Sequence, residues 1–187
     1  MDPGARRRNP WRTTGTREVY ANPWIRLRED AVVHPDGSPG IYGVVSKPLA
    51  TGVVALTRDD EVVLVGQWRY PLERYSWEIV EGAADPGEDG LEAIQRELRE
   101  EAGYRAEHWE LLVDGLALSN SVSDEEAALY VATGLRRVPV DRDPTEELEV
   151  AHVPFDAAVA MVDRGDITDA MTVVALLTLY RRRSLGR

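Results

Sequence analysis

Short stretches in which apolar and polar residues alternate run through most of the chain after Arg17. A period of two is typical of strands, and turn residues such as Pro35-Asp36-Gly37 separate neighbouring strands into hairpins. An N-terminal hairpin is predicted from the two stretches that flank this turn, Trp24–His34 and Ile41–Ser46. Altogether the pattern predicts strands over Glu18–Ala21, Trp24–His34, Ile41–Ser46, Gly52–Leu56, Val62–Gln67, Trp77–Val80, Tyr104–Leu116, Ala127–Ala132 and Glu147–Val153.

Three other stretches have helical character. Glu88–Ala102 carries its apolar residues on one stripe, and Phe155–Arg164 and Ala170–Arg183 are further helices, the last of them capped by Asp166-Ile167-Thr168-Asp169. Strands that alternate with helices in this way predict an α/β fold with a mixed sheet and helices packed on it.

Length and composition limit the domain organisation and the partners that the chain can have. The 187 residues predict one main domain, 49–187, preceded by a flexible arm, 1–14, and an N-terminal β region, 15–48. A net charge of −11 disfavours a nucleic-acid partner, because phosphate backbones are repelled. The chain has no cysteine, and neither a run of about 18 apolar residues nor an apolar signal core is present. We therefore expect a soluble cytoplasmic protein without a membrane partner.

Acidic residues crowd one side of the first helix. At about 100° per residue, Glu97, Glu100 and Glu101 occupy one arc of about 100° beside the apolar stripe. Three neighbouring carboxylates repel one another, and cations between them would remove that cost. Mg²⁺ suits such a site because it prefers oxygen ligands and keeps waters for a substrate. The alternative is a solvated helix face with Glu–Arg pairs.

The spacing of the segment 82–104 decides between these interpretations. It resembles the Nudix box of the Nudix hydrolases, and Leu98 fits an apolar position of the box, while Tyr104 stands where an aliphatic residue is commoner. The identity positions that match are Gly82, Glu88, Arg96, Glu97, Glu100, Glu101 and Gly103.

The resemblance implies a fold, a reaction and a set of roles. The fold would be an α/β/α sandwich around a mixed sheet, and the reaction would be hydrolysis of a nucleoside diphosphate linked to another group. Glu97 and Glu101 would be the main ligands of Mg²⁺, with Mn²⁺ also possible, and Glu100 a supporting one. Glu81 would donate a backbone carbonyl to the metal, and Glu88 would secure the box through Arg96.

The flanks of the box resemble the branch that hydrolyses ADP-ribose and other nucleoside diphosphate sugars. Arg69 would bind phosphate or sugar, although a surface salt bridge is the alternative, and Glu78 would be a substrate-site carboxylate or a strand-end charge. Members of this branch form homodimers through the N-terminal sheet, and the same is expected here. Trp24 and Tyr42 stand where some members stack the base, with ordinary packing as the alternative.

Two segments beyond the box bear on the substrate and the proton transfer. The stretch 118–125 lacks the proline of the Ser-Pro-Gly type segment common in ADP-ribose hydrolases, which keeps other nucleotide sugars open; Glu125 there is a candidate substrate contact. The acidic loop 143–150 resembles a loop of this branch in which a glutamate acts as a base or binds a further metal ion. Glu146 aligns best with that glutamate, and Glu147 aligns next best. Glu146 or a box glutamate, Glu100 or Glu101, would take the proton from the attacking water.

The sequence thus predicts Mg²⁺-dependent cleavage of ADP-ribose or a related nucleoside diphosphate sugar into nucleoside monophosphate and sugar phosphate. Two alternatives remain open. One is a Nudix hydrolase of nucleoside triphosphates or dinucleoside polyphosphates. The other is a catalytically silent, nucleotide-sensing Nudix domain, although the box carboxylates are all retained.

Overall fold

The computed structural model describes residues 8–140 and 147–186. The chain divides into two compact units. The N-terminal unit contains the chain up to Lys47 together with Ser119–Glu125, and the larger unit contains Pro48–Leu118 and the chain from Glu126 onward.

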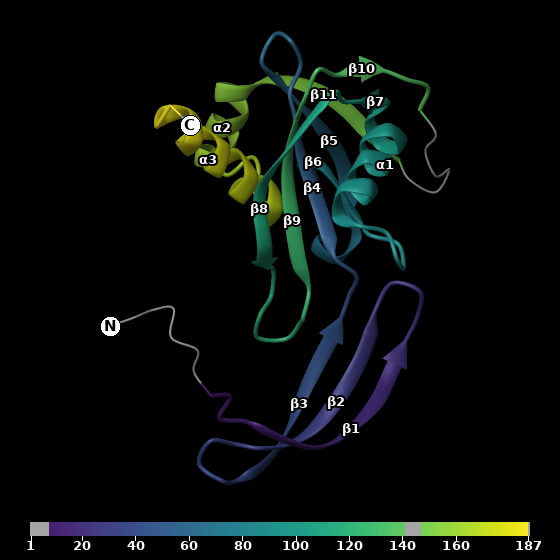
Figure 1. The fold of residues 1–187 in the computed structure, drawn as a ribbon, viewed down its shortest axis with the longest axis vertical. Coiled ribbons are helices and arrows are strands. Elements are labelled where there is room, and N and C mark those ends of the chain that lie inside the picture. Colours follow the sequence, from purple (N-terminus) through teal and green to yellow (C-terminus); the bar gives the residue numbers. More distant parts are fainter. Residues whose placement is uncertain (1–7, 141–146, 187) are drawn as a thin grey trace. The chain divides into compact units, whose positions relative to one another are not determined.

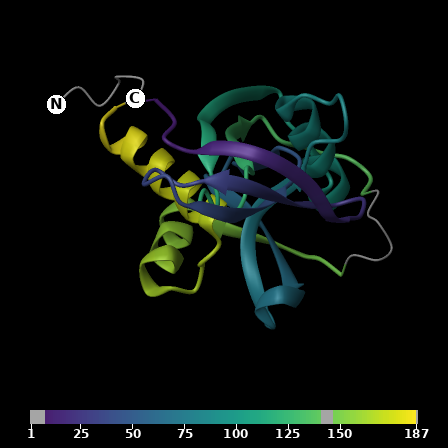
Figure 2. The same ribbon diagram turned by 90° about the horizontal axis from the view of Figure 1, so that it is seen from below.

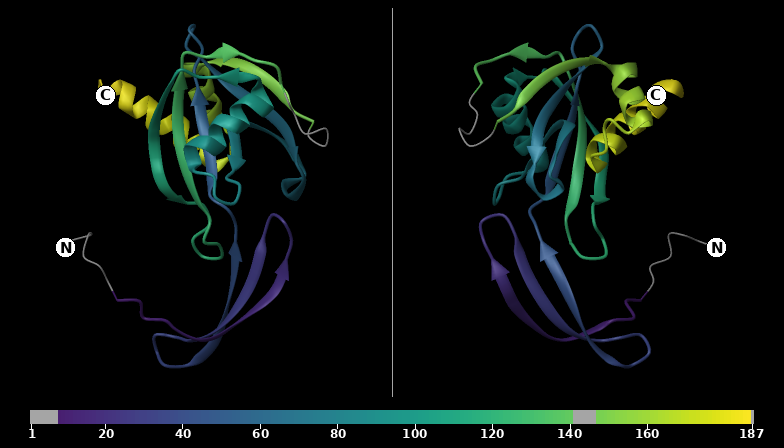
Figure 3. Two further views of the ribbon diagram at one scale, coloured as in Figure 1. Left: turned by 45° about the vertical axis from the view of Figure 1, so that its right-hand side comes forward. Right: turned by 180° about the vertical axis from the view of Figure 1, so that it is seen from behind.

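The N-terminal unit is an antiparallel sheet in the order β1-β2-β3 (Figure 3). Its strands are β1 (Arg12–Ala21), β2 (Arg26–Val33) and β3 (Pro39–Ser46). The sheet is larger than the predicted hairpin, because β1 pairs with β2 along its whole length. It also begins three residues inside the segment predicted as a flexible arm, since β1 already pairs with β2 at Arg12.

The segment 119–125 is bound to this sheet although it lies far away in sequence. The backbone N–H of Val45 donates to the carbonyl of Val122 at 2.8 Å, and the Ser123 hydroxyl donates to the carbonyl of Val45 at 2.9 Å. The connection between two strands of the larger unit therefore belongs to the N-terminal unit.

The larger unit is built on a six-stranded sheet in the order β11-β5-β6-β4-β9-β8. The β4–β9 pair is parallel and the other pairs are antiparallel, so the sheet is mixed as predicted. A pair of short strands, β7 and β10, lies outside it, because the stretch predicted as one strand from Tyr104 to Leu116 is broken after Arg105. The elements are β4 (Ala50–Ala55), β5 (Glu61–Arg69), the 3₁₀ turn η1 (Tyr70–Leu72), β6 (Arg74–Ala83), β7 (Tyr104–Arg105), β8 (His108–Ala117), β9 (Glu126–Thr133), β10 (Arg136–Arg137) and β11 (Glu149–Pro154).

Helices cover both faces of the six-stranded sheet. Helix α1 (Gly90–Ala102) lies on one face, and α2 (Phe155–Arg164) and α3 (Ala170–Ser184) lie on the other (Figures 1 and 2). Each face has its own buried cluster: Ile94 and Leu98 of α1 belong to one, and Ala175 and Leu176 of α3 to the other. The predicted α/β/α sandwich is confirmed.

Side-chain caps fix where two of the helices begin. Asp89 caps α1 through the backbone N–H groups of Leu91 and Glu92, so the helix starts two residues later than the predicted Glu88. Asp169 caps α3, as the sequence predicts. Among residues 8–140 and 147–186, no helix has the length and apolar character needed to cross a membrane.

Strand β6 exchanges one hydrogen-bonding partner for another along its length. Its first half pairs with β5 as far as Ile79, and its second half pairs with β4 from Val80 onward. The end of β6 consequently lies between α1 on one face and α3 on the other, and this end carries most of the candidate site.

Candidate active site

Gly82 at the end of β6 allows α1 to approach the backbone of the strand. A Cβ atom at this position would lie 2.2 Å from the carboxyl carbon of Glu97, far closer than two carbon atoms can come. The carbonyl of Gly82 accepts a hydrogen bond of 3.1 Å from the Thr51 hydroxyl, which ties this backbone to β4. Only glycine lets the Glu97 carboxylate occupy this place.

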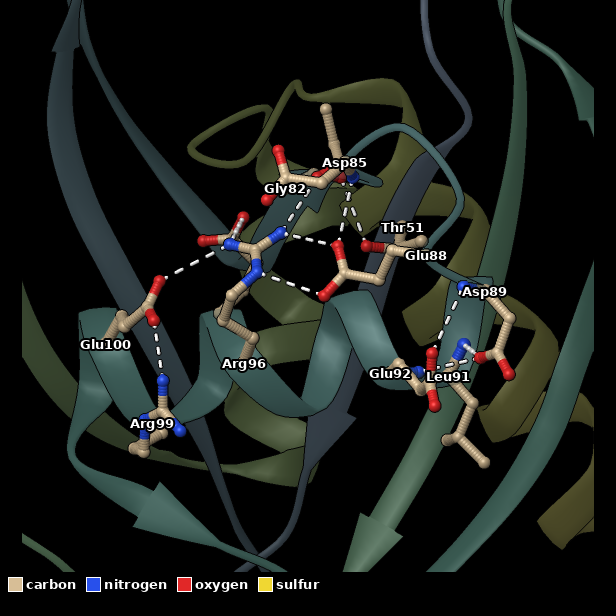
Figure 4. Close-up of polar contacts among 12 residues, drawn as sticks. Thr51, Gly82, Asp85, Glu88, Asp89, Leu91, Glu92, Arg96, Arg99 and Glu100 are labelled. Atoms are coloured by element: carbon tan, nitrogen blue, oxygen red, sulfur yellow. Dashed lines mark hydrogen bonds and ion pairs between the residues drawn. The ribbon is translucent and has the colours of Figure 1, made fainter.

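Arg96 partly neutralises the acidic side of α1 (Figure 4). Its Nε and Nη2 donate to the two carboxylate oxygens of Glu88 at 3.1 and 3.0 Å, and its Nη1 donates to Glu97 at 2.7 Å and to Glu100 at 3.3 Å. Nη2 also donates to the carbonyl of Ala83 at 3.0 Å. These bonds raise the pKa of Arg96 above its usual value, the bond from Glu88 most of all, and they lower the pKa of Glu88. The contact expected between Glu88 and Arg96 is present.

The carboxylates of α1 differ in their surroundings. Glu100 also accepts a bond of 2.7 Å from Arg99, whereas Glu101 is buried with 7% of its surface exposed. A hard divalent ion suits these donors, because Glu97, Glu100 and Glu101 offer carboxylate oxygens from neighbouring positions of one helix. In the part of the chain that the structure describes, no three acidic or histidine side chains already converge as metal ligands. Glu97 and Glu100 instead share the Arg96 guanidinium.

The other face of the same strand end carries a second acidic group. The Glu81 side chain accepts a hydrogen bond of 2.9 Å from the Thr172 hydroxyl of α3 and lies beside the Asp169 carboxyl. Burial raises the pKa of Glu81 well above its ordinary value, and the neighbouring charge of Asp169 raises it further. Glu81 is thus partly buried between the strand and the first turn of α3.

Arg69 and Glu78 form an ion pair upstream of the box. The Arg69 Nε donates to both carboxylate oxygens of Glu78 at 2.9 and 3.1 Å, and its Nη2 also contacts Glu78. The pair raises the pKa of Arg69. Together with Arg74 and Asp169 it lines a hollow of about 320 Å³. The salt bridge considered as an alternative for Arg69 therefore exists, and the pair still borders a space of ligand size.

Three of the remaining predicted residues, Trp24, Tyr42 and Glu125, belong to the N-terminal unit. Trp24 is 73% exposed, and the Tyr42 hydroxyl donates to the carbonyl of Ser121 at 2.7 Å, both within the N-terminal unit. Glu125 forms an ion pair with Lys47 in that unit. Glu147 is exposed, and Glu146 lies outside the described residues.

Thr172 is the residue of this region that the sequence did not reveal. It has no exposed surface, and an isolated threonine within an apolar helical stretch gives no signal of its own. Asp169 was predicted only as a helix cap, and the cap motif was the one available indication that this turn carries polar contacts.

Comparison with known proteins identifies the family. Residues 46–172 match the NUDIX domain, and residues 11–45 match the nucleoside diphosphate sugar hydrolase N-terminal domain. The chain belongs to the NUDIX family. Hydrolases of this family generally use a divalent metal ion, which agrees with the acidic face of α1.

Several relatives cover nearly the whole chain of this Nudix protein. It is 32% identical to the methanol dehydrogenase activator of Bacillus methanolicus, over 93% of this chain and 95% of that protein. It is 31% identical to the ADP-ribose pyrophosphatase of Mycobacterium tuberculosis, over 90% of this chain and 82% of that protein. A solved structure of an ADP compounds hydrolase superposes with a TM-score of 0.82 over 98% of this chain and all of that chain, at 22% identity, which shows the shared fold.

Proposed function

We propose that this Nudix protein hydrolyses the pyrophosphate bond of ADP-ribose or a related nucleoside diphosphate sugar, giving nucleoside monophosphate and sugar phosphate. The observation that carries the proposal is the packing of the Glu97 carboxylate on the Gly82 backbone beside Glu100 and Glu101. The match of residues 11–45 to a nucleoside diphosphate sugar hydrolase domain supports this class of substrate. So does the similarity to ADP-ribose pyrophosphatases.

Glu97 and Glu101 are the proposed ligands of Mg²⁺, with Glu100 and the backbone carbonyl of Glu81 in support. A divalent ion supplies positive charge to the pyrophosphate oxygens and makes a nearby water more acidic. Mn²⁺ is expected to substitute for Mg²⁺. Glu100, Glu101 or Glu146 accepts the proton from the attacking water.

Several residues are proposed as substrate contacts. Arg69 donates to phosphate or sugar oxygens, in competition with the Glu78 carboxylate to which it is paired. Glu78 is a carboxylate of the substrate site. Trp24 and Tyr42 stack the base, and Glu125 is a further contact. We propose that an N-terminal β region, which begins with β1 at Arg12, precedes a catalytic domain, 49–187. We further propose that it forms a homodimer, acts in the cytoplasm and binds no nucleic acid.

A substrate panel tests the proposal. Purified protein with Mg²⁺ is incubated with ADP-ribose, ADP-glucose, GDP-mannose, UDP-glucose, nucleoside triphosphates and dinucleoside polyphosphates, and the products are separated by anion-exchange chromatography. Mg²⁺-dependent release of nucleoside monophosphate from a sugar nucleotide is expected. Preferred cleavage of triphosphates or dinucleoside polyphosphates would contradict the substrate class. Calorimetric nucleotide binding without any product would indicate a silent sensor.

A further inference from the structure

A single hydroxyl of α3 links the backbone of β6 to Glu81. The backbone N–H of Ile79 donates to the Thr172 Oγ1 at 3.0 Å, and Oγ1 donates to the Glu81 Oε1 at 2.9 Å. The backbone N–H of Thr172 donates to the Asp169 Oδ2 at 2.8 Å. These contacts connect the first turn of α3 to the strand that ends in Gly82.

The contacts from Ile79 through Thr172 to Glu81 form a relay with a defined direction. Oγ1 accepts from the Ile79 N–H through a lone pair and donates its one proton to the Glu81 Oε1. Ile79 lies where β6 stops pairing with β5 and begins to pair with β4. The Thr172 hydroxyl is the hydrogen-bond acceptor of the Ile79 N–H at this point. Valine has nearly the same shape and would fill the buried position, but it would leave both Ile79 and Glu81 without this partner.

The position of Glu81 connects the relay to the site. Glu81 directly precedes Gly82, whose backbone is in contact with the Glu97 carboxylate. A rotation of the Glu81–Gly82 peptide would move the surface on which Glu97 packs, together with the Glu81 carbonyl. Partners that orient metal ligands without touching the ion typically change metal affinity by about 10–100-fold when removed.

We propose that Thr172 is a positioning residue for the divalent metal site, with Asp169 in support. It holds the Glu81 side chain, and through it the Glu81–Gly82 backbone, in the orientation that the carboxylates of α1 need to bind the ion. The inference rests on the proposed function, because that function places the ion at Glu97 and Glu101.

The test uses the full-length chain and Mn²⁺ as the probe. Mn²⁺ binding in the absence of nucleotide is measured by isothermal titration calorimetry and by the electron paramagnetic resonance signal of free Mn²⁺. Thr172→Val is expected to bind Mn²⁺ about tenfold more weakly than the wild type. Thr172→Ser keeps the hydroxyl and is expected to stay within about threefold. Thr178→Val removes a hydroxyl from the same helix away from the site and is the matched control.

Thermal unfolding establishes that each variant is folded, and Thr172→Ala replaces Thr172→Val if the valine side chain prevents folding. In activity assays, the Mg²⁺ concentration for half-maximal rate should rise in Thr172→Val, while the KM for the nucleotide sugar stays within about twofold, because Thr172 does not reach the substrate.

The outcomes separate the relay from the proposed function. Unchanged Mn²⁺ affinity in folded Thr172→Val overturns the relay, and so does an equal loss in Thr172→Ser, because packing rather than the hydroxyl would then be responsible. Weakened Mn²⁺ binding in Thr172→Val, combined with no hydrolysis of any nucleotide by the wild type, would overturn the proposed function and support the relay. Absence of Mn²⁺ binding by the wild type would overturn both.

Discussion

The two faces of β6 hold their carboxylates in different ways. On the α1 face, the Arg96 guanidinium forms ion pairs with Glu88, Glu97 and Glu100. On the α3 face, Glu81 accepts a hydrogen bond from a neutral hydroxyl and lies beside another carboxyl group. The first arrangement lowers the pKa of its acid Glu88, whereas the second raises the pKa of Glu81.

This difference suits two different tasks. Carboxylates paired with a guanidinium stay ionised and available to a cation, and an ion of higher charge can replace part of that pairing. A partly buried acid held by a hydroxyl contributes little charge, but its position is fixed. We infer that α1 supplies the charge of the site and that α3 supplies its geometry.

The largest effect is expected at the glycine between the two faces. Gly82→Ala places a methyl group in the space of the Glu97 carboxylate, so the side chain must leave and metal-dependent turnover should fall by at least about 100-fold, as for a displaced catalytic group. Overpacking should also cost about 1–3 kcal/mol in the free energy of unfolding. Steady-state kinetics and urea unfolding measure both.

Gly43→Ala is the control for this substitution, because a Cβ at Gly43 meets no atom within 4 Å. Wild-type turnover in Gly82→Ala would show that Glu97 is not needed at this place.

Removal of the guanidinium should affect the α1 face next. Arg96→Met leaves Glu88, Glu97 and Glu100 without their shared partner, and the free energy of unfolding should fall by about 2 kcal/mol in the absence of divalent ions. Saturating Mg²⁺ should restore part of this loss, because the ion replaces the missing charge. Urea unfolding of wild type and variant with Mg²⁺ or EDTA measures the difference. An equal loss of unfolding free energy with Mg²⁺ and with EDTA would show that Arg96 does not act at the metal site.

The α3 face should respond to pH. The pKa of Glu81 in the folded protein lies above its ordinary value of 4.5, so the folded state binds a proton that the unfolded state has released. Stability from this group is therefore present at low pH and is lost as pH rises from 4.5 through the folded pKa.

Glu81→Gln cannot ionise, so metal-free wild type should lose stability relative to this variant as the pH is raised. Urea unfolding between pH 5 and pH 8, a range of about three units around neutrality, follows the difference. A difference that stays constant across this range would show that Glu81 is ionised in the folded protein like an exposed glutamate.

The smallest effects should come from the helix caps. Asp89→Ala and Asp169→Ala each remove an N-cap and should each cost about 1 kcal/mol in the free energy of unfolding. Only Asp169→Ala should also weaken Mn²⁺ binding, because Asp89 caps the far end of α1 from its acidic turns. Calorimetry decides the point, and equal Mn²⁺ affinity in the two variants would remove Asp169 from the relay.

Local patterns predicted one face of this site and not the other. The apolar stripe of α1, its acidic arc and the Arg96–Glu88 contact all follow from residues within one segment, and the structure brings them together. The contact from Thr172 to Glu81 joins residues 91 positions apart, and only the topology of the sheet brings α3 to β6.

A contact between residues 78 positions apart in the N-terminal unit, Lys47 and Glu125, was likewise not predictable from local patterns. Glu125 was predicted as a substrate contact, and its ion pair to Lys47 depends on a pairing with β3 that alternation alone does not specify. The six-stranded order, with its one parallel pair β4–β9, likewise required the structure.

We infer that the acidic end of α1 is a divalent metal site for pyrophosphate cleavage. The most direct measurement is the rate of AMP release from ADP-ribose as a function of Mg²⁺ concentration for wild type, Glu101→Gln and the control Glu110→Gln, whose carboxylate is exposed and pairs with Arg182. We expect Mg²⁺-dependent release by wild type and control, and nearly none by a folded Glu101→Gln at any Mg²⁺ concentration. Near-wild-type release by Glu101→Gln at saturating Mg²⁺ would contradict the account.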